Sequence, residues 1–262
     1  MAQPYDDNFF DTLPESARPS AEILVPLVMQ MVHPASVIDV GCGTGTWLAV
    51  FAENGVKDIL GVDGDYVNRA MLHIPQDKFI ASNLSQPFRI ERRFDLAMSL
   101  EVAEHLSPEC AETFIDTLTG LAPVVLFSAA IPYQGGVAHL NEQWPEWWAK
   151  LFRARGFVTV DCLRRKLWKD ERPDFWYAQN SFIAVHETCL QAFPILKQEY
   201  ELGNNAVLPL VSPFVMENLS FSFDPQKVNV AKAWHLLCQV AKNGVKRRLS
   251  KKRPVKGRKS SL

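Results

Sequence analysis

The stretch "VIDVGCGTG", Val37–Gly45, carries the pattern that decides the fold. It opens with apolar and β-branched residues typical of a buried strand, and a helical pattern begins at its end and covers 45–55. Three alternate glycines, Gly41, Gly43 and Gly45, lie where the two meet. Glycine lets the backbone turn tightly and lets a ligand approach the main chain closely. This order of strand, glycine turn and helix predicts a ligand site at the carboxyl edge of a parallel sheet.

An acidic residue at the end of the second predicted strand narrows the class of ligand. Asp63 follows Asp39 by 24 residues, and a carboxylate there can accept both hydroxyls of a ribose. The dinucleotide fingerprint is disfavoured because Thr46 stands where its third glycine belongs. A phosphate-binding P-loop is excluded because no Gly-Lys-Ser or Gly-Lys-Thr follows the turn. The pattern therefore predicts a ligand that contains a nucleoside.

The segment Asp39–Gly45 has the form D-x-G-x-G-x-G and resembles motif I of the class I S-adenosylmethionine-dependent methyltransferases. In that family the glycines and the second acidic residue contact the cofactor, and the first acidic residue supports the loop. The resemblance extends to "ASNL" (81–84), beside the adenine, and to "FDLAMSLEVAEHL" (94–106), whose strand end lines the cofactor and acceptor pockets. The resemblance implies these cofactor-binding residues: Asp39, Gly41, Gly43, Gly45, Asp63, Asn83, Leu84, Leu100 and Glu101.

The resemblance covers roughly residues 20–187. Within it, "WYAQNSFIAV" (176–185) is similar to a bacterial subgroup of small-molecule methyltransferases associated with glycan and secondary-metabolite biosynthesis. It implies S-adenosylmethionine as the cofactor and a small-molecule acceptor. We expect methylation at an oxygen atom of a sugar or a similarly hydroxylated metabolite.

Short apolar runs alternate with helical patterns over the first 190 residues, which predicts right-handed βαβ units. We expect an α/β fold with a doubly wound, seven-stranded, mostly parallel sheet of the Rossmann-like methyltransferase type, an antiparallel edge and a C-terminal helical extension. The predicted strands cover 36–42, 58–64, 78–82, 94–100, 123–131, 157–163 and 181–187. The predicted helices cover 45–55, 66–74, 107–121 with Ser107 as N-cap, and the tryptophan-rich segment that begins at 143 and ends near Gly156. No helix is predicted between the last two strands, and Trp144, Trp147 and Trp148 are expected to share a core-facing helix face.

The charged residues are distributed unevenly between the C-terminal segment and the rest of the chain. Residues 242–262 hold ten Lys and Arg and no acidic residue, which leaves 18 basic against 29 acidic residues elsewhere, a net charge of −11. We predict a methyltransferase domain over 1–190, a C-terminal extension with an amphipathic helix over 191–241, and a basic, disordered tail over 242–262. Two alternatives to a merely solvated tail are its attraction to an anionic membrane or to nucleic acid and its folding against the acidic body of the chain.

The composition favours a soluble cytoplasmic protein. Five cysteines are scattered without a C-x-x-C pair, which disfavours a disulfide framework and a cysteine-based zinc site. The N-terminus lacks the basic and apolar regions of a signal peptide. No apolar run approaches the roughly 20 residues that a membrane-spanning helix needs.

The segment "SLEVAEHL", 99–106, holds the candidate catalytic groups. His105 and His139 are the expected catalytic residues, since both follow strand ends at the predicted active-site edge and could act as bases on a hydroxyl acceptor. Glu101, Glu104, His105 and His139 also resemble the metal ligands of the small-RNA 2′-O-methyltransferases and of the ubiquinone O-methyltransferases. A divalent metal is the less favoured reading, and a purely structural role for the segment is a third.

Two other function classes stay open. One is a nucleotide-linked oxidoreductase, and the other is a non-catalytic methyltransferase-like module that recruits a partner through its basic tail. A methyltransferase that acts on RNA is disfavoured, because the acidic body offers no basic face beyond the tail.

Overall fold

The computed structural model describes residues 7–213, 215 and 216. The chain divides into two compact units, Met1–Ser212 and Pro213–Leu262, and every helix and strand described below lies in the first. The amphipathic helix and the basic tail predicted near the C-terminus lie outside the described residues, and the domain boundaries at 190 and 241 stay predictions. Among the described residues, no helix is both long and apolar enough to cross a membrane.

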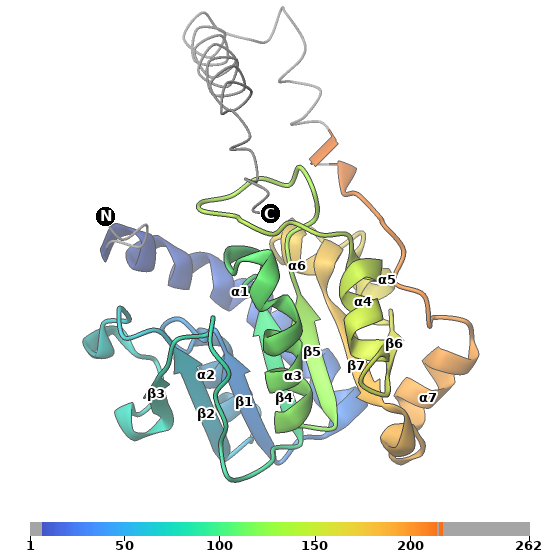
Figure 1. Cartoon of the computed structure of the whole chain (residues 1–262), viewed down its shortest axis with the longest axis horizontal. Coiled ribbons are helices and arrows are strands. Elements are labelled where there is room, and N and C mark those ends of the chain that lie inside the picture. Colours follow the sequence, from blue (N-terminus) through green and yellow to red (C-terminus); the bar gives the residue numbers. More distant parts are fainter. Residues whose placement is uncertain (1–6, 214, 217–262) are drawn as a thin grey trace, which may run out of the picture. The chain divides into compact units, whose positions relative to one another are not determined.

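The core of the fold is a seven-stranded sheet with strand order β3-β2-β1-β4-β5-β7-β6 (Figure 1). Neighbouring strands from β3 to β5 run parallel, and β7 runs antiparallel to both β5 and β6. This confirms the predicted fold class, and each strand is somewhat shorter than its predicted run. The strands are β1 (Ser36–Val40), β2 (Asp58–Asp63), β3 (Phe79–Ala81), β4 (Leu96–Leu100), β5 (Val124–Ser128), β6 (Phe157–Val160) and β7 (Phe182–His186).

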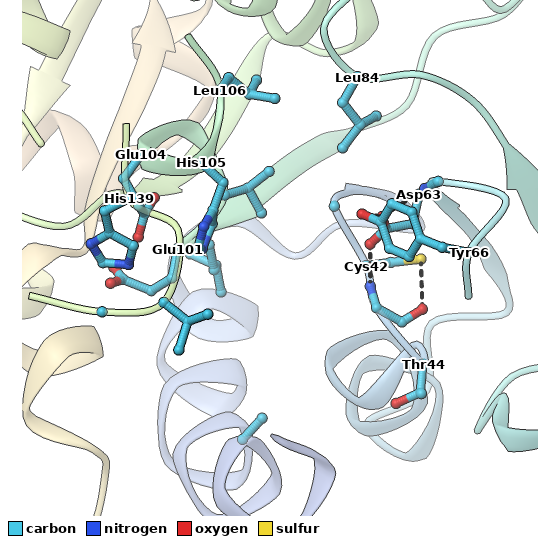
Figure 2. A pocket seen from close by; sticks show the side chains of 18 of the residues that line it. Cys42, Thr44, Asp63, Tyr66, Leu84, Glu101, Glu104, His105, Leu106 and His139 are labelled. Atoms are coloured by element: carbon cyan, nitrogen blue, oxygen red, sulfur yellow. Dashed lines mark hydrogen bonds between the residues drawn. The ribbon is translucent and has the colours of Figure 1, made fainter. Parts of the chain in front are cut away.

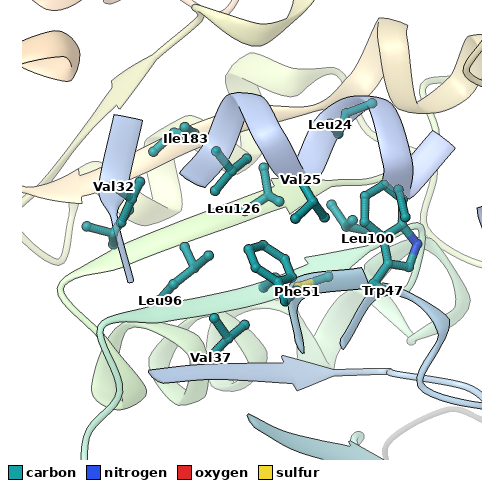
Figure 3. Packing of buried hydrophobic residues seen from close by; sticks show 14 of the residues in the cluster. Leu24, Val25, Val32, Val37, Trp47, Phe51, Leu96, Leu100, Leu126 and Ile183 are labelled. Carbon is teal, nitrogen blue, oxygen red and sulfur yellow. The ribbon is translucent and has the colours of Figure 1, made fainter. Parts of the chain in front are cut away.

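Helices cover both faces of the sheet, so successive strand residues are buried in opposite directions. In β1, Val37 belongs to a hydrophobic cluster that includes residues of α1, α2, α5, α6 and α7, whereas Ile38 belongs to a second cluster that includes residues of α3 and α4. The helices are α1 (Asp7–Val32), α2 (Thr46–Glu53), α3 (Ala111–Leu121), α4 (Pro145–Arg153), α5 (Leu163–Leu167), α6 (Phe175–Asn180) and α7 (Pro194–Glu201). Figure 3 shows part of the core on the face of the sheet that α1 covers, here called the first layer. Leu24 and Val25 of α1 lie there over Leu126 of β5.

The core on the opposite face, which α3 and α4 cover and which is here called the second layer, is centred on aromatic rings. Phe127 of β5 is fully buried, and its ring centroid lies 5.3 Å from Trp148, 5.4 Å from Phe152 and 5.5 Å from Phe182. These contacts join β5 and β7 to α4.

We expect Phe127→Ala to lower the free energy of unfolding by about 3–5 kcal/mol, because it leaves a cavity among three rings. Urea denaturation measures the loss. Leu202→Ala is the matched control, since Leu202 is 69% exposed and its removal should change stability by less than about 0.5 kcal/mol. A loss below about 1 kcal/mol for Phe127→Ala would show that the layer repacks.

Three local predictions are wrong. The helix predicted over 66–74 is only a 3-10 turn, Arg69–Met71, because the Asn68 side chain accepts a hydrogen bond from Ala70 N and closes a turn in place of a helix start. The helix predicted from Ser107 begins at Ala111, after the 3-10 turn Pro108–Cys110, and the Ser107 side chain makes no capping bond. The connection between β6 and β7 contains two short helices, α5 and α6.

The tryptophan face is also corrected. Trp148 is buried in the second layer, but Trp144 lies just before α4 and is 38% exposed. Pro145 is the first residue of α4 and follows the extended backbone of Trp144, so Trp144 is not on the helix face. Only part of the predicted set therefore faces the core.

Candidate active site

A cavity of about 940 Å³ lies at the carboxyl ends of the central strands. Its volume is in the range of ligand pockets and is large enough for a nucleoside ligand with an acceptor beside it. Figure 2 shows Asp63 and Tyr66 on one side of it and Glu101, His105 and His139 on the other. The predicted site residues that line the cavity are Gly41, Gly43, Asp63, Asn83, Leu84, Leu100, Glu101, Glu104, His105 and His139.

The glycine turn forms one wall because its backbone is left-handed. Gly41 has a φ of 91° and Gly43 a φ of 52°, values that a residue with a side chain adopts only under strain. A Cβ on Gly41 would lie 2.3 Å from the Val102 side chain, whereas a Cβ on Gly43 would meet nothing within 4 Å. The turn thus packs tightly against the segment after β4 and leaves the main chain at Gly43 open to a ligand.

Asp63 ties the glycine turn to the end of β2. Its Oδ2 accepts a hydrogen bond from Gly43 N at 2.7 Å, and its Oδ1 accepts from Gly64 N and from the Tyr66 hydroxyl, both at 2.6 Å. Burial raises the pKa of Asp63, and the bonds from Tyr66, Gly43 and Gly64 act in the opposite direction. The carboxylate is held in place by the loop that it supports.

Asp39 and Gly45, both predicted to belong to the cofactor site, do not line the cavity. Asp39 is buried in β1, where burial and the nearby charge of Asp63 raise its pKa well above the usual range. Gly45 precedes α2, and a Cβ there would lie 2.9 Å from Ile74. Their positions indicate that Asp39 and Gly45 support the glycine turn without lining the cavity.

Asn83 and Leu84 follow β3 and line the cavity. The Asn83 Oδ1 accepts a hydrogen bond from Ser85 N at 3.0 Å, so its Nδ2 is the atom that can donate to a base.

Glu101 marks the opposite side of the cavity and directly follows β4. It has a φ of 55°, an uncommon value for a residue other than glycine, and its N–H donates to Ser128 O at 3.1 Å. Its carboxylate accepts from Asn180 Nδ2 at 3.0 and 3.2 Å and from Gln134 Nε2 at 3.2 Å. Burial raises the pKa of Glu101, and these amide bonds oppose the shift. The same bonds hold the carboxylate in one orientation.

Glu104, His105 and His139 form a second polar group beside Glu101. One possible ligand atom from each of the three lies within 4.8 Å of the others, and the two imidazoles stand edge to face with centroids 4.8 Å apart (Figure 2). Glu104 is fully buried, and neither carboxylate oxygen has a hydrogen-bond partner among the described residues. Burial and then the charge of Glu101 raise the pKa of Glu104 well above its usual range.

His105 is neutral near pH 7 in this surrounding. Burial first, and then the neighbouring His139, lower the pKa of His105 to about 4. A neutral imidazole can accept a hydrogen bond from a hydroxyl group or bind a metal ion through its lone pair.

Sequence reasoning missed several residues of the site. Gln134 and Asn180 hold Glu101, Glu142 lies 2.9 Å from His139 Nδ1, and the Tyr66 hydroxyl donates to Asp63. Two of these pairs are local in sequence, Asp63-x-x-Tyr66 and His139-x-x-Glu142, and this spacing was the signal available. Gln134 and Asn180 come from distant parts of the chain and had no signal of their own.

The arrangement fits S-adenosylmethionine. The exposed main chain at Gly43 and the Asp63 carboxylate suit the nucleoside, and the imidazoles across the cavity suit an acceptor beside it.

Comparison with known proteins agrees with this fit. A family model described as a methyltransferase domain matches residues 15–169. A comparison with curated proteins gives no match.

Two solved structures with a TM-score of 0.50 share this fold, and a third is similar over much of the chain. An O-methyltransferase family protein from Burkholderia thailandensis is 16% identical, with a TM-score of 0.50 over 70% of this chain and 60% of that one. DesVI from Streptomyces venezuelae is 16% identical, with a TM-score of 0.50 over 68% of this chain and 95% of that one. CalS10 from Micromonospora echinaspora, an amino pentose methyltransferase with S-adenosylmethionine bound, is 16% identical, with a TM-score of 0.48 over 71% of this chain and 99% of that one.

The family match covers more than half of the chain and includes the glycine turn, Asp63 and the segment that carries Glu101, Glu104 and His105. The chain belongs to the methyltransferase domain family and is an S-adenosylmethionine-dependent methyltransferase with a Rossmann-like fold.

Proposed function

We propose that this enzyme methylates a hydroxyl oxygen of a small molecule, a sugar or a similarly hydroxylated metabolite. The observation that carries the proposal is the position of His105 and His139 in the same cavity as Gly43 and Asp63. The cofactor supplies the methyl group when bound. The protein then has to orient the acceptor, exclude water and receive the proton of the hydroxyl group.

The two imidazoles are the groups that suit an uncharged hydroxyl. Because His105 is neutral, it can accept a hydrogen bond from the acceptor and hold its oxygen toward the cofactor side. An imidazole whose unprotonated nitrogen faces the acceptor can take the proton through that nitrogen as the oxygen attacks. Trp176 and Tyr177 also line the cavity and provide apolar surface for the carbon skeleton of an acceptor.

A divalent metal is the second way in which this cavity could activate a hydroxyl group. The buried carboxyl group of Glu104 and the two nearby imidazoles supply oxygen and nitrogen ligands, and Glu101 lies beside them. A bound cation would compensate the cost of a buried carboxylate, and it would acidify the acceptor hydroxyl. We place this alternative behind the imidazole mechanism.

Chelation of metal ions by EDTA distinguishes the imidazole mechanism from the metal alternative. We expect release of S-adenosylhomocysteine with a panel of monosaccharides, nucleotide sugars and phenols, and we expect the rate to persist in excess EDTA. Reactions without acceptor are the control. A rate that vanishes in EDTA and returns with Mg²⁺ or Mn²⁺ would favour the metal alternative.

The same assay tests the proposed substrate class. Turnover on RNA alone would contradict it, and calorimetric preference for NAD over S-adenosylhomocysteine would contradict the family assignment itself. The cytoplasmic location and the contacts of the basic tail stay predictions.

A further inference from the structure

The loop of residues 131–144, here called the His139 loop, has a strained backbone. Two residues other than glycine, Tyr133 with a φ of 72° and Ala138 with a φ of 59°, adopt left-handed conformations. Such conformations persist only where the surroundings hold them, and they are concentrated at functional sites. The loop connects β5 to α4 and carries His139 into the cavity wall.

Glu142 is the residue that holds this loop together. Its Oε2 accepts from Tyr133 N at 2.9 Å, and its Oε1 accepts from Gly135 N at 3.0 Å. The same Oε1 lies 2.9 Å from His139 Nδ1. The Glu142 side chain is only 22% exposed, so water screens these bonds weakly.

The bond to Glu142 determines which nitrogen of His139 carries the proton. An ionised carboxylate can only accept, so Nδ1 must be the donor, and the lone pair of the neutral ring is then on Nε2. Nε2 lies against Gly136, where an added Cβ would come within 2.2 Å of it. Gly136 and His139 both line the cavity.

A second set of bonds anchors the loop beside His105. The backbone N–H groups of Leu140 and Asn141 donate to Glu104 O at 2.7 and 3.0 Å. The loop is thereby joined to the 3-10 turn Ala103–His105, and the two imidazoles are brought together.

We propose that Glu142 is a positioning residue that holds His139 as its Nδ1–H tautomer and so presents the Nε2 lone pair to the acceptor hydroxyl. The identity of the acceptor rests on the proposed function, but the tautomer does not. Outer partners that orient a functional histidine in this way are commonly worth about 10–100-fold in activity.

The test reads the tautomer directly. The full-length protein is labelled with ¹⁵N-histidine, and its imidazole signals are recorded at a pH high enough to keep the rings neutral, with His139→Ala providing the assignment. We expect Nδ1–H for His139 in the wild type and a shift toward Nε2–H in Glu142→Ala. For an acceptor found in the panel, kcat of Glu142→Ala should fall about 10–100-fold, with the affinity for S-adenosylhomocysteine within about twofold of the wild type.

Two further variants make the result specific. Glu142→Gln keeps an oxygen that can accept from Nδ1–H, so it should retain the tautomer and a higher kcat than Glu142→Ala. Glu146→Ala is the matched control, because Glu146 pairs with Arg153 on the exposed side of α4 and should change neither readout.

An Nε2–H signal for His139 in the wild type would overturn the proposal, and so would an unchanged tautomer or kcat in a folded Glu142→Ala protein. Should Glu142→Ala fail to fold, the wild type and Glu142→Gln still decide, since Nε2–H in either overturns it. If no hydroxylated acceptor were methylated, the proposed function would fail while the tautomer result would stand.

Discussion

Asp63→Ala should lower the affinity for S-adenosylhomocysteine by at least roughly 100-fold, which corresponds to about 2.7 kcal/mol. The Asp63 carboxylate accepts from Gly43 N, Gly64 N and the Tyr66 hydroxyl, and hydrogen bonds to a charged group are worth about 1.5–3 kcal/mol each. Alanine removes the bond that fixes the glycine turn and also the acceptor for the ribose hydroxyls. Isothermal titration calorimetry measures the loss.

Asp58→Ala is the matched control for this prediction. Asp58 begins the same strand, β2, at its opposite end and pairs with Arg92 on the surface. Its replacement should leave the affinity unchanged. Melting curves without ligand show whether Asp63→Ala is folded. A folded Asp63→Ala protein that binds as tightly as the wild type would remove Asp63 from the cofactor site.

His105→Ala is expected to lower kcat by about 10²–10⁴-fold while the affinity for S-adenosylhomocysteine stays close to that of the wild type. The reason is that His105 lies across the cavity from Asp63, beside His139 and Glu104, where it can contact the acceptor. The measurement combines single-turnover methylation with calorimetry, so that loss of chemistry is distinguished from loss of cofactor binding.

His73→Ala serves as the control, because His73 is exposed and does not line the cavity. Repeating both assays in EDTA separates the roles of His105. If His105 acts without a metal, the wild-type rate is insensitive to EDTA and the variant is slow in either buffer. A His105→Ala protein with the wild-type rate would show that the imidazole only shapes the pocket wall.

The local predictions succeeded where neighbouring residues determine the structure. The turn after β1 requires left-handed backbone, and the glycines that allow it lie at alternate positions within five residues of sequence. The seven strands were found because both faces of the sheet are buried and each strand is a short apolar run. The helix predicted over 66–74 failed, since one Asn68 side-chain bond outweighed a helical pattern.

The partners of the site residues depend on strand order. β7 lies between β5 and β6 and runs antiparallel, so Asn180, two residues before β7, arrives at the edge where β4 ends. Glu101 and Asn180 are 79 positions apart in sequence, and no local pattern joins them. Glu142 was missed for a related reason, because its three bonds close only when the loop after β5 folds back on itself.

The sequence by itself determined the parallel sheet, the glycine turn and Asp63, because the spacing of apolar residues and glycines is sufficient for these local elements. It also put His105 and His139 forward as candidates. Only the tertiary structure brought their rings to 4.8 Å, buried Glu104 beside Glu101 and set Glu142 against Nδ1 of His139. Burial and contacts between distant residues set the charge and orientation of these groups, and both arise only when the sheet and its loops are assembled.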